Sequence, residues 1–533
     1  MAARLNSPST DPVNAQLIAA LQARIVGFES KVAGFESEVA GLQSSLKSVS
    51  IERDLLRERV RAFERTLFAA KSEARGTQQR DLFFNEAELL TPTTEPTPKV
   101  RVPAHDRAKR GRRPIDPALP REVIRYELSE AERVCPHDGT ALKEIGVEAS
   151  EQLDIIPAQV RVLRHERVKY ACPCCAQGVR TAALPAKLLP KSMLSEGALA
   201  WVITAKYQDA LPLYRQAAIL GRCGGEIARN TLAHNVVRVG QAVIPIINLL
   251  RDHLLEAELL YGDETELQVL KEDGRPAQSK SYLWVQVSGT GPPVRLFTYA
   301  PSRSARTALD LYEGIANHAA LMSDGYEPYA SVAASSALKH LGCWAHVRRK
   351  FVEAEAALPK AARDATQPST QFVALIAELY ACEAHADELK MNIDERHQLR
   401  RVRSVQVLAQ IEALVLQHLH SVLPQSLLGR ALHYLHGQWP KLVRFVDDGR
   451  YPLDNNTAEN AIRPFVIGRK NWLFSDSVGG ANASANLYSL IESAKANGIE
   501  PYRYLRQLFQ ALPSAQSVDD FEALLPWNIK LPT

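Results

Sequence analysis

The sequence predicts a multidomain α+β protein in which an α/β core is interrupted by a helical insertion. Three observations support this fold class. A heptad pattern occupies the N-terminal segment, a cysteine cluster follows it, and strand-like and helix-like runs alternate from residue 256 onward. At 533 residues the chain is too long for a single hydrophobic core, so we expect several domains.

The order of elements in residues 256–357 is that of an RNase H-like fold. One strand-like run ends at Asp263, and SYLWVQVS and VRLFTYA are two more. Helical ARTALDLYEGIANH, strand-like HAALMSD and then the segment GCWAHVRRKFVEA follow in this order. The first and fourth strands of that fold are neighbours. We therefore expect Asp263 and Asp324 to lie close together, although they are far apart in the sequence.

Three carboxylates predict a two-metal phosphoryl-transfer site. Asp263 and Asp324 close apolar runs, and Glu459 opens a helix-like run after the insertion. A lone Asp after a strand is more often a turn or cap residue, but the shared context favours a site. Two Mg²⁺ ions roughly 3.5–4 Å apart activate a nucleophile and stabilise a leaving oxygen. Because Mg²⁺ prefers oxygen ligands and keeps several waters, three acids suffice to hold both ions.

The N-terminal segment predicts a coiled coil over residues 14–70. Apolar residues alternate steps of three and four, and only Arg53 breaks the seam. The seam consists of Ile18, Leu21, Ile25, Phe28, Val32, Phe35, Val39, Leu42, Leu46, Val49, Leu56, Val60, Phe63 and Leu67. Such a helix needs a partner. Self-association into a homo-oligomer is the simplest expectation, and a hairpin or a different protein partner are the alternatives.

A Pro/Thr-rich and basic linker follows at residues 71–114. TPTTEPTPK is expected to stay extended, and a basic stretch comes directly after it. Within that stretch, Lys109, Arg110, Arg112 and Arg113 form the cluster KRGRRP. A flexible basic arm neutralises phosphates and enters a minor groove, so we expect it to bind DNA. A solvated linker without a partner is the alternative.

The cysteine cluster predicts a zinc-binding module over residues 115–190. Cys172 and Cys175 have the C-x-x-C spacing that binds Zn²⁺, and Cys135 begins the matching half. Seven cysteines, an odd number, fit metal ligation in a reduced compartment better than a disulfide framework. A module that has lost its metal is the alternative.

Residues 191–250 predict a helix-turn-helix-like DNA-binding segment. ALPLYRQAAILGRCGGEIARNTLAHNVVRVG contains two helical runs separated by a Gly-rich turn, with TLAHNVVRVG as the candidate recognition helix. Many αα-hairpins bind no nucleic acid, so the outline alone is a weak signal. Its position between the cysteine cluster and the core favours DNA binding.

The chain resembles the DDE transposases of the insertion-sequence-66 family. The resemblance covers about residues 100–530 and rests on many motifs in one order: DET, SDGY, CWAHVRRKF, DNN followed by Glu and IRPF, and WLFSDSVGGANASANLYSLIESAKANGIEPYRYL. It implies binding of an element's terminal repeats, followed by Mg²⁺-dependent cleavage and strand transfer into target DNA. It also implies accessory proteins encoded by the same element.

The resemblance sharpens the zinc assignment. Family members usually carry a second cysteine where this sequence has Asp138. The expected ligands of one Zn²⁺ are therefore Cys135, Asp138, Cys172 and Cys175, with His137 or Cys174 as alternatives for the fourth position.

Basic residues near the acids are candidates for substrate contacts. His346, Arg348, Arg349 and Lys350 follow the fifth strand, and Arg463 lies one helical turn after Glu459. Their expected partners are the phosphates of the scissile or target strand, with Arg463 clamping a phosphate through its planar fork. Surface ion pairs are the alternative for each of them.

The remaining boundaries and the cellular setting follow from the same patterns. The core is expected at 256–357 and 449–510, with the helical insertion at 358–448 and a tail at 511–533. The start lacks the apolar core of a signal peptide, and no run of about 18 apolar residues predicts a membrane span. We expect a cytoplasmic protein, associated with the nucleoid when bound to DNA. The rival functions are a transposase-derived regulatory protein without catalysis and a nuclease that cuts without joining.

Overall fold

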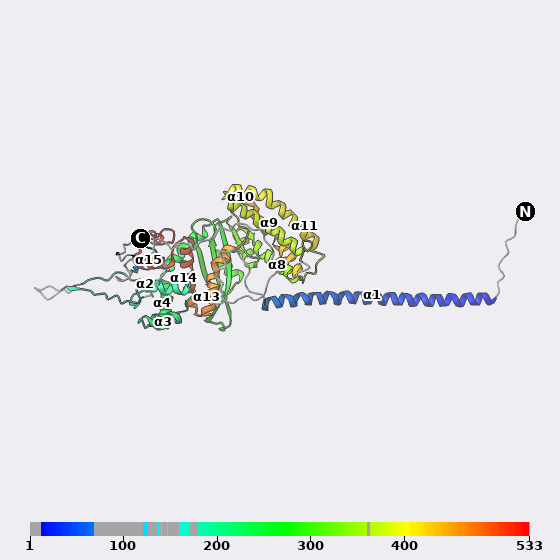
Figure 1. Cartoon of the computed structure of the whole chain (residues 1–533), viewed down its shortest axis with the longest axis horizontal. Helices are drawn as coiled ribbons and strands as arrows, with labels where there is room; N and C mark the ends of the chain where they lie inside the picture. The colour runs from blue at the N-terminus through cyan, green and yellow to red at the C-terminus, as the bar shows by residue number, and fades with distance from the viewer. Residues whose placement is uncertain are drawn as a thin grey trace. The chain divides into compact units, whose positions relative to one another are not determined.

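The computed structural model describes residues 12–68, 121–125, 127, 137, 140, 147, 159–170, 180–359 and 363–531. Figure 1 shows a mixed β-sheet with helices packed around it and a long N-terminal helix. The protein is thus a mixed α/β structure with many helices, as expected. Among the described helices, none is both long enough and apolar enough to cross a bilayer.

The central sheet has the strand order β5-β4-β3-β6-β7. Its strands are β3 (Leu259–Lys271), β4 (Lys280–Ser288), β5 (Arg295–Ala300), β6 (Ala320–Ser323) and β7 (Lys339–Gly342). The first three are antiparallel, whereas β6 and β7 run parallel to β3. The predicted pairing of the first and fourth strands is confirmed, because Leu259, Leu260 and Tyr261 pair with Ala320, Leu321 and Met322.

The first strand is longer than predicted. It does not end at Asp263 but continues to Lys271, pairing with β4 as far as Gln268. The short strand β8 (Ser475–Ser477) then pairs with its last residues. The charged run DETE looks like the end of a strand, yet the backbone there still has partners on β4. Asp263 therefore lies within the strand, where neighbouring side chains alternate between two faces.

This alternation decides what each residue of DET faces. On one face, Gly262 lies against two tyrosines. Tyr312 directly follows α6 (Ala305–Leu311), and Tyr329 lies in α7 (Glu327–Ser335). On the other face, the hydroxyl of Thr265 accepts a 3.4 Å hydrogen bond from Arg469 of α13 (Asn456–Trp472). Asp263 shares that second face. The sheet thus directs it toward α13.

The edge strand β5 is covered by α14 (Val478–Ala496). The Ser493 and Ser489 hydroxyls, one turn apart, accept hydrogen bonds of 2.9 and 2.8 Å from the amides of Arg295 and Phe297. Open sheet edges invite pairing with other chains, and covering them prevents it. Here two serines satisfy the edge amides directly.

Helices fill the predicted insertion. They are α9 (Pro368–Glu388), α10 (Ile393–Leu399), the π-helix Arg400–Ser404, α11 (Val405–His418), α12 (Leu427–Leu442) and the 3₁₀ turn Val443–Asp447. Figure 1 shows α9, α10 and α11 grouped beside α8 (Trp344–Ala357). The Phe351 and Phe372 rings stack at 4.3 Å where α8 meets α9.

Four helices lie between β2 (Arg180–Thr181) and the central sheet in the sequence. They are α2 (Glu196–Tyr207), α3 (Leu213–Arg222), α4 (Arg229–Ala242) and α5 (Ile244–Leu255). The predicted pair of helices with a Gly-rich turn is therefore present as α3 and α4. One face of α4 is buried, and near its C-terminal end Gly240 lies against Ala483 of α14. Of its exposed residues, Arg229, Asn230 and His234 lie in its N-terminal half and Gln241 near its C-terminal end.

The remaining elements are short or lie at the C-terminal end. They are the antiparallel pair β1 (Lys169–Tyr170) and β2 (Arg180–Thr181), helix α15 (Pro501–Ala511), the 3₁₀ turn Leu512–Ser514 and α16 (Val518–Glu522). The predicted tail packs on the core, since the Glu522 carboxylate lies 3.0 Å from the His253 ring of α5. It is thus part of the folded structure.

The N-terminal segment forms one helix, α1 (Pro12–Phe68), across most of the predicted range. Its described seam residues are exposed: Leu21, Ile25, Phe28, Val32, Phe35, Val39, Leu42, Leu46, Val49, Leu56 and Val60. An apolar stripe of this length on a helix surface is typical of an interaction site. Pairing of this helix with a partner stays a prediction.

Gly262→Ala is expected to lower the stability of the core. A Cβ at this position would lie 2.4 Å from the Tyr312 hydroxyl and 2.7 Å from the Tyr329 ring. Overpacking of this kind costs about 1–3 kcal/mol. The expected result is a lower urea midpoint, followed by circular dichroism.

Gly437→Ala in α12 is the matched control. Nothing lies within 4 Å of its added methyl group, and alanine stabilises an exposed helix by about 0.5–1 kcal/mol. The two substitutions should therefore shift the midpoint in opposite directions. Equal shifts would contradict the close approach at Gly262.

Candidate functional site

Asp263 lies among other acids. Burial and the negative charges of Glu264, Asp324 and Glu459 raise its pKa well above the usual value. One hydrogen bond opposes this shift, a 2.9 Å donation from the Glu264 amide to Asp263 Oδ1. Asp324 and Glu459 act on Asp263 because both lie near it. The three predicted acids therefore lie in one region of the structure, close enough for Asp324 and Glu459 to affect Asp263 electrostatically.

Asp324 follows directly after β6 and caps a turn. Its Oδ1 accepts a 2.9 Å hydrogen bond from the Tyr326 amide at the start of α7, which is a typical Asx turn. The helical insertion closes on the same turn. Carbon and oxygen atoms of the Tyr434 side chain in α12 lie 3.0 Å from the position of a Cβ on Gly325, so this ring packs closely on the turn. The insertion thus helps to hold the second acid in place.

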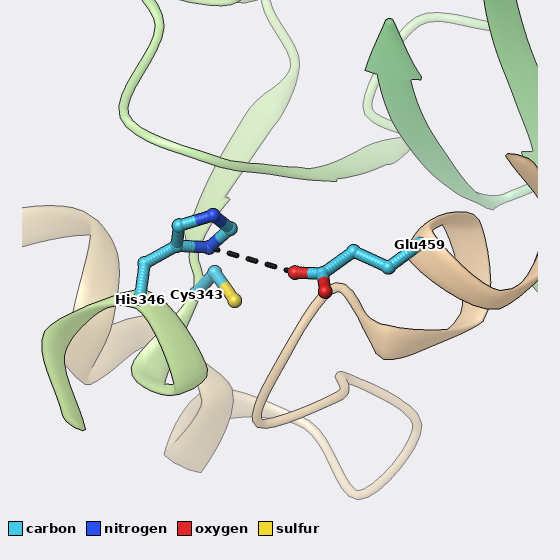
Figure 2. A group of neighbouring side chains, drawn as sticks. All are labelled: Cys343, His346 and Glu459. Atoms are coloured by element: carbon cyan, nitrogen blue, oxygen red, sulfur yellow. Dashed lines mark ion pairs between the residues drawn. The ribbon is translucent and has the colours of Figure 1, made fainter. Parts of the chain in front are cut away.

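Glu459 lies in the first turn of α13, as the sequence predicts, and faces α8. Its Oε1 lies 3.8 Å from His346 Nδ1, and its Oε2 lies 3.6 Å from the Arg349 guanidinium. Figure 2 shows His346 and Glu459 pointing toward each other, with Cys343 beside them. Burial lowers the pKa of His346, although the Glu459 carboxylate favours the charged ring.

Asn455 connects three elements around the site, β3, α8 and α13. Its side-chain amide donates a 2.9 Å hydrogen bond to the Gly262 carbonyl of β3. Its backbone amide donates to Cys343 Sγ, at the start of α8, over 3.2 Å. Only 1% of Asn455 is exposed. This residue therefore fixes the beginning of α13, and with it Glu459, against β3 and α8.

Glu264 is a fourth acid at the site. Burial raises its pKa to about 7, against a 2.8 Å hydrogen bond from the Tyr329 hydroxyl. The Arg303 guanidinium lies 3.9 Å from its other oxygen and over the Tyr326 ring. Glu264 thus connects β3 to the helix that follows Asp324.

Similar proteins identify the family of the domain that carries these acids. Residues 191–483 match the family described as "Transposase IS66 family". The chain belongs to the IS66 transposase family. In Sinorhizobium fredii (strain NBRC 101917 / NGR234), uncharacterized protein y4jD is 33% identical over 77% of this chain and 81% of its own length. Uncharacterized protein y4qI of that strain is 31% identical over 88% of both chains.

Further matches cover the ends of this IS66 transposase. Residues 132–176 match the "zinc-finger binding domain of transposase IS66", and this range contains all four predicted zinc ligands. Residues 55–124 match "Transposase C of IS166 homeodomain", and residues 489–527 match the "IS66 C-terminal element". The chain therefore has zinc-finger and DNA-binding domains next to its transposase domain.

Several predicted residues of the IS66 transposase lie outside the described residues. These are the zinc ligands Cys135, Asp138, Cys172 and Cys175 and the basic cluster Lys109, Arg110, Arg112 and Arg113. Their roles stay predictions.

The other basic candidates differ in position. His346 and Arg349 lie beside Glu459. Lys350 lies over the Tyr434 ring at 4.6 Å, and the charge of Arg348 acts on the Tyr380 hydroxyl of α9. Arg463 is half-buried in α13. Of this group, His346 and Arg349 are therefore in direct reach of the acid cluster.

Sequence reasoning missed four residues around the acids: Glu264, Cys343, Tyr434 and Asn455. Signals for three of them were present, since Glu264 follows Asp263, Cys343 precedes His346 by one helical turn, and Asn455 belongs to DNN. Tyr434 has no such signal, because its position depends on how the insertion folds back.

Asn455→Ala is expected to destabilise the transposase core by about 1–3 kcal/mol. The Gly262 carbonyl would be buried without its donor, which costs more than the net value of one hydrogen bond. Chemical denaturation measures the change. Asn456→Ala is the control, because its amide bonds Asp454 at the surface, and an equal loss in both variants would contradict the clamp.

Acidification is expected to destabilise the fold through His340. Burial lowers its pKa from 6.5 to about 3, and its ring lies 2.8 Å from Ser323, directly before Asp324. Because the unfolded chain takes up this proton near pH 6.5 and the folded chain only near pH 3, stability falls as pH decreases below 6.5.

The measurement is urea denaturation at pH 7 and pH 5 for wild type and His340→Gln. The loss should be about 1–2 kcal/mol larger in wild type. The exposed His433→Gln control should lose as much as wild type. An identical pH dependence in wild type and His340→Gln would refute the assignment.

Proposed function

We propose that this protein is an active transposase of a bacterial insertion sequence, with Asp263, Asp324 and Glu459 as its catalytic residues. It would bind the terminal repeats of the element and catalyse DNA cleavage and strand transfer. The observation that carries this proposal is the position of Asp263, where burial and the nearby charges of Glu264, Asp324 and Glu459 raise its pKa. Gathering like charges in a partly buried place costs stability and is typical of functional sites.

The acid cluster fits divalent magnesium. All three side chains offer carboxylate oxygens, the ligands that Mg²⁺ prefers. Glu459 Oε1 is buried and has no hydrogen-bond partner among the described residues, so one ligand oxygen is available. Two bound Mg²⁺ ions would supply charge stabilisation at the attacking and leaving oxygens of the phosphodiester.

The surrounding side chains would orient the substrate. Arg349, beside Glu459, is placed to contact a phosphate of the scissile strand, and His346 is placed to hold a proton or a water near that carboxylate. Arg348, Lys350 and Arg463 are further candidates for phosphate contacts. Positioning and charge would then account for the catalysis, without a covalent protein intermediate.

An RNase H-like core accounts for the arrangement of the acids. The strand order, with three antiparallel strands followed by two parallel ones, supports this assignment. We assign the core to residues 256–357 and 449–510, and the insertion to 358–448. The covered edge of β5 and the clamp at Asn455 support one continuous core made of both parts.

Recognition of the element's ends would involve the segments before the core. We assign zinc binding to Cys135, Asp138, Cys172 and Cys175, and phosphate binding to Lys109, Arg110, Arg112 and Arg113. In the helix pair, the exposed Arg229, Asn230 and His234 are the candidates for contacting DNA. Together these segments would hold one end of the element.

Helix α1 would bring two copies together as a coiled coil. Its exposed seam supports pairing, and strand transfer needs two element ends held side by side. Accessory proteins encoded by the same element are further candidate partners.

The test is Mg²⁺-dependent cleavage and strand transfer on labelled DNA carrying the element's ends. Asp263→Asn, Asp324→Asn and Glu459→Gln should each lower the rate about 100-fold or more, because each removes a negatively charged metal ligand. Binding of the ends, measured by mobility shift, should persist.

Asp273→Asn is the control, because Asp273 is an exposed acid in the turn after β3. Its cleavage rate should equal that of wild type. End binding without cleavage in wild type, with accessory proteins present, would favour the regulatory function. Cleavage without joining would favour a nuclease.

A further inference from the structure

We propose that Cys343, His346 and Glu459 form a second kind of metal site, one for a thiophilic transition metal such as Zn²⁺. Zn²⁺ bound there would withhold Glu459 from Mg²⁺ and so inhibit the enzyme. The inhibitory part rests on the proposed function, whereas the binding part stands on the geometry alone.

The first support is the approach of three unlike donors. One sulfur, one imidazole nitrogen and one carboxylate oxygen lie within 4.8 Å of one another. They come from separate places in the sequence, since Cys343 and His346 belong to the start of α8 and Glu459 to α13 (Figure 2). A sulfur, a nitrogen and an oxygen in this arrangement are ligands that Zn²⁺ uses in proteins.

The second support is a pair of orphaned atoms. His346 Nδ1 and Glu459 Oε1 are both buried, and neither has a hydrogen-bond partner among the described residues. They face each other at 3.8 Å, which is too long for a hydrogen bond. Zinc lies roughly 2.0–2.2 Å from nitrogen and oxygen ligands, so an ion between these atoms would satisfy both.

The third support is the environment of the sulfur. Cys343 is the N-cap of α8, where the helix dipole favours negative charge, and its Sγ accepts the Asn455 amide at 3.2 Å. Burial opposes ionisation and raises the pKa of the thiol to about 12. Metal binding would replace the thiol proton, which is released to solvent as the sulfur–metal bond forms.

The same donors discriminate against magnesium. Mg²⁺ takes oxygen ligands and gains little from a thiolate or an imidazole, whereas Zn²⁺ binds both strongly. Three protein ligands leave a fourth position of a tetrahedral ion for water or a DNA phosphate. Glu459 is the ligand common to both metals. Zn²⁺ and Mg²⁺ would therefore compete for the third acid.

The binding test uses Co²⁺ as a spectroscopic probe for the zinc site, on the full chain after one equivalent of Zn²⁺ has loaded the zinc finger. Wild type should show a thiolate-to-cobalt charge-transfer band that Cys343→Ser lacks. Cys382→Ser is the matched control, because Cys382 is also buried but lies in α9, where it accepts a hydrogen bond from Ser404. This control should keep the band.

The inhibition test measures Mg²⁺-supported cleavage as Zn²⁺ is added, with each variant normalised to its own rate in Mg²⁺ alone. Cys343→Ser should need at least about tenfold more Zn²⁺ for half inhibition than wild type or Cys382→Ser. Raising Mg²⁺ should relieve the inhibition of wild type.

The two tests separate the site from the proposed function. A cobalt band of equal strength in wild type and Cys343→Ser overturns the metal site, whatever the protein catalyses. A band that depends on Cys343, in a protein without cleavage activity, supports the site while the transposase proposal fails. Equal Zn²⁺ sensitivity of active wild type and active Cys343→Ser overturns the inhibitory role.

Discussion

Repulsion among carboxylates is the constraint on which the rest of the site depends. Burial and the negative charges of Glu264, Asp324 and Glu459 raise the pKa of Asp263, and burial and the charge of Asp324 raise that of Glu264. Such a cluster would separate if its members were on mobile loops. The fold holds each of them on a regular element or directly at its end, which is the placement that a precise site requires.

Different contacts oppose the repulsion at each acid. The parallel pairing of β3 with β6 fixes the approach of Asp263 and Asp324. The Asx turn and the contact with Tyr434 hold the loop after β6. Glu459 gains from its place in the first turn of α13, because the N-terminal end of a helix attracts negative charge. Asn455 then ties that helix end to the strand, so the third acid follows the first.

The sequence was sufficient to predict an element where a short local pattern determines its secondary structure. Alternating and continuous apolar runs predicted β4, β5 and β6, and the place of each acid after a strand or at a helix start was right for Asp324 and Glu459. The end of β3 was wrong, because DETE looks too polar for a strand interior. Tyr329 and Arg303 meet the Glu264 carboxylate on one face, and these contacts lie far away in the sequence.

The residues that sequence analysis missed have roles that depend on long-range packing. Cys343 lies in the motif CWAHVRRKF, in which the sequence singles out the basic residues. Its sulfur becomes a candidate ligand only because the fold places it beside Asn455 and Glu459. The Glu459 carboxylate therefore lies between two sets of possible donors: the oxygens of Asp263 on β3 and Asp324 after β6, and the sulfur and nitrogen of Cys343 and His346 at the start of α8. Because hard and borderline metals rank these sets in opposite order, the orientation of Glu459 would decide which of the two proposed metals is bound. The helical insertion separates α8 from α13 in the sequence, so the way it folds back determines how closely the two sets approach.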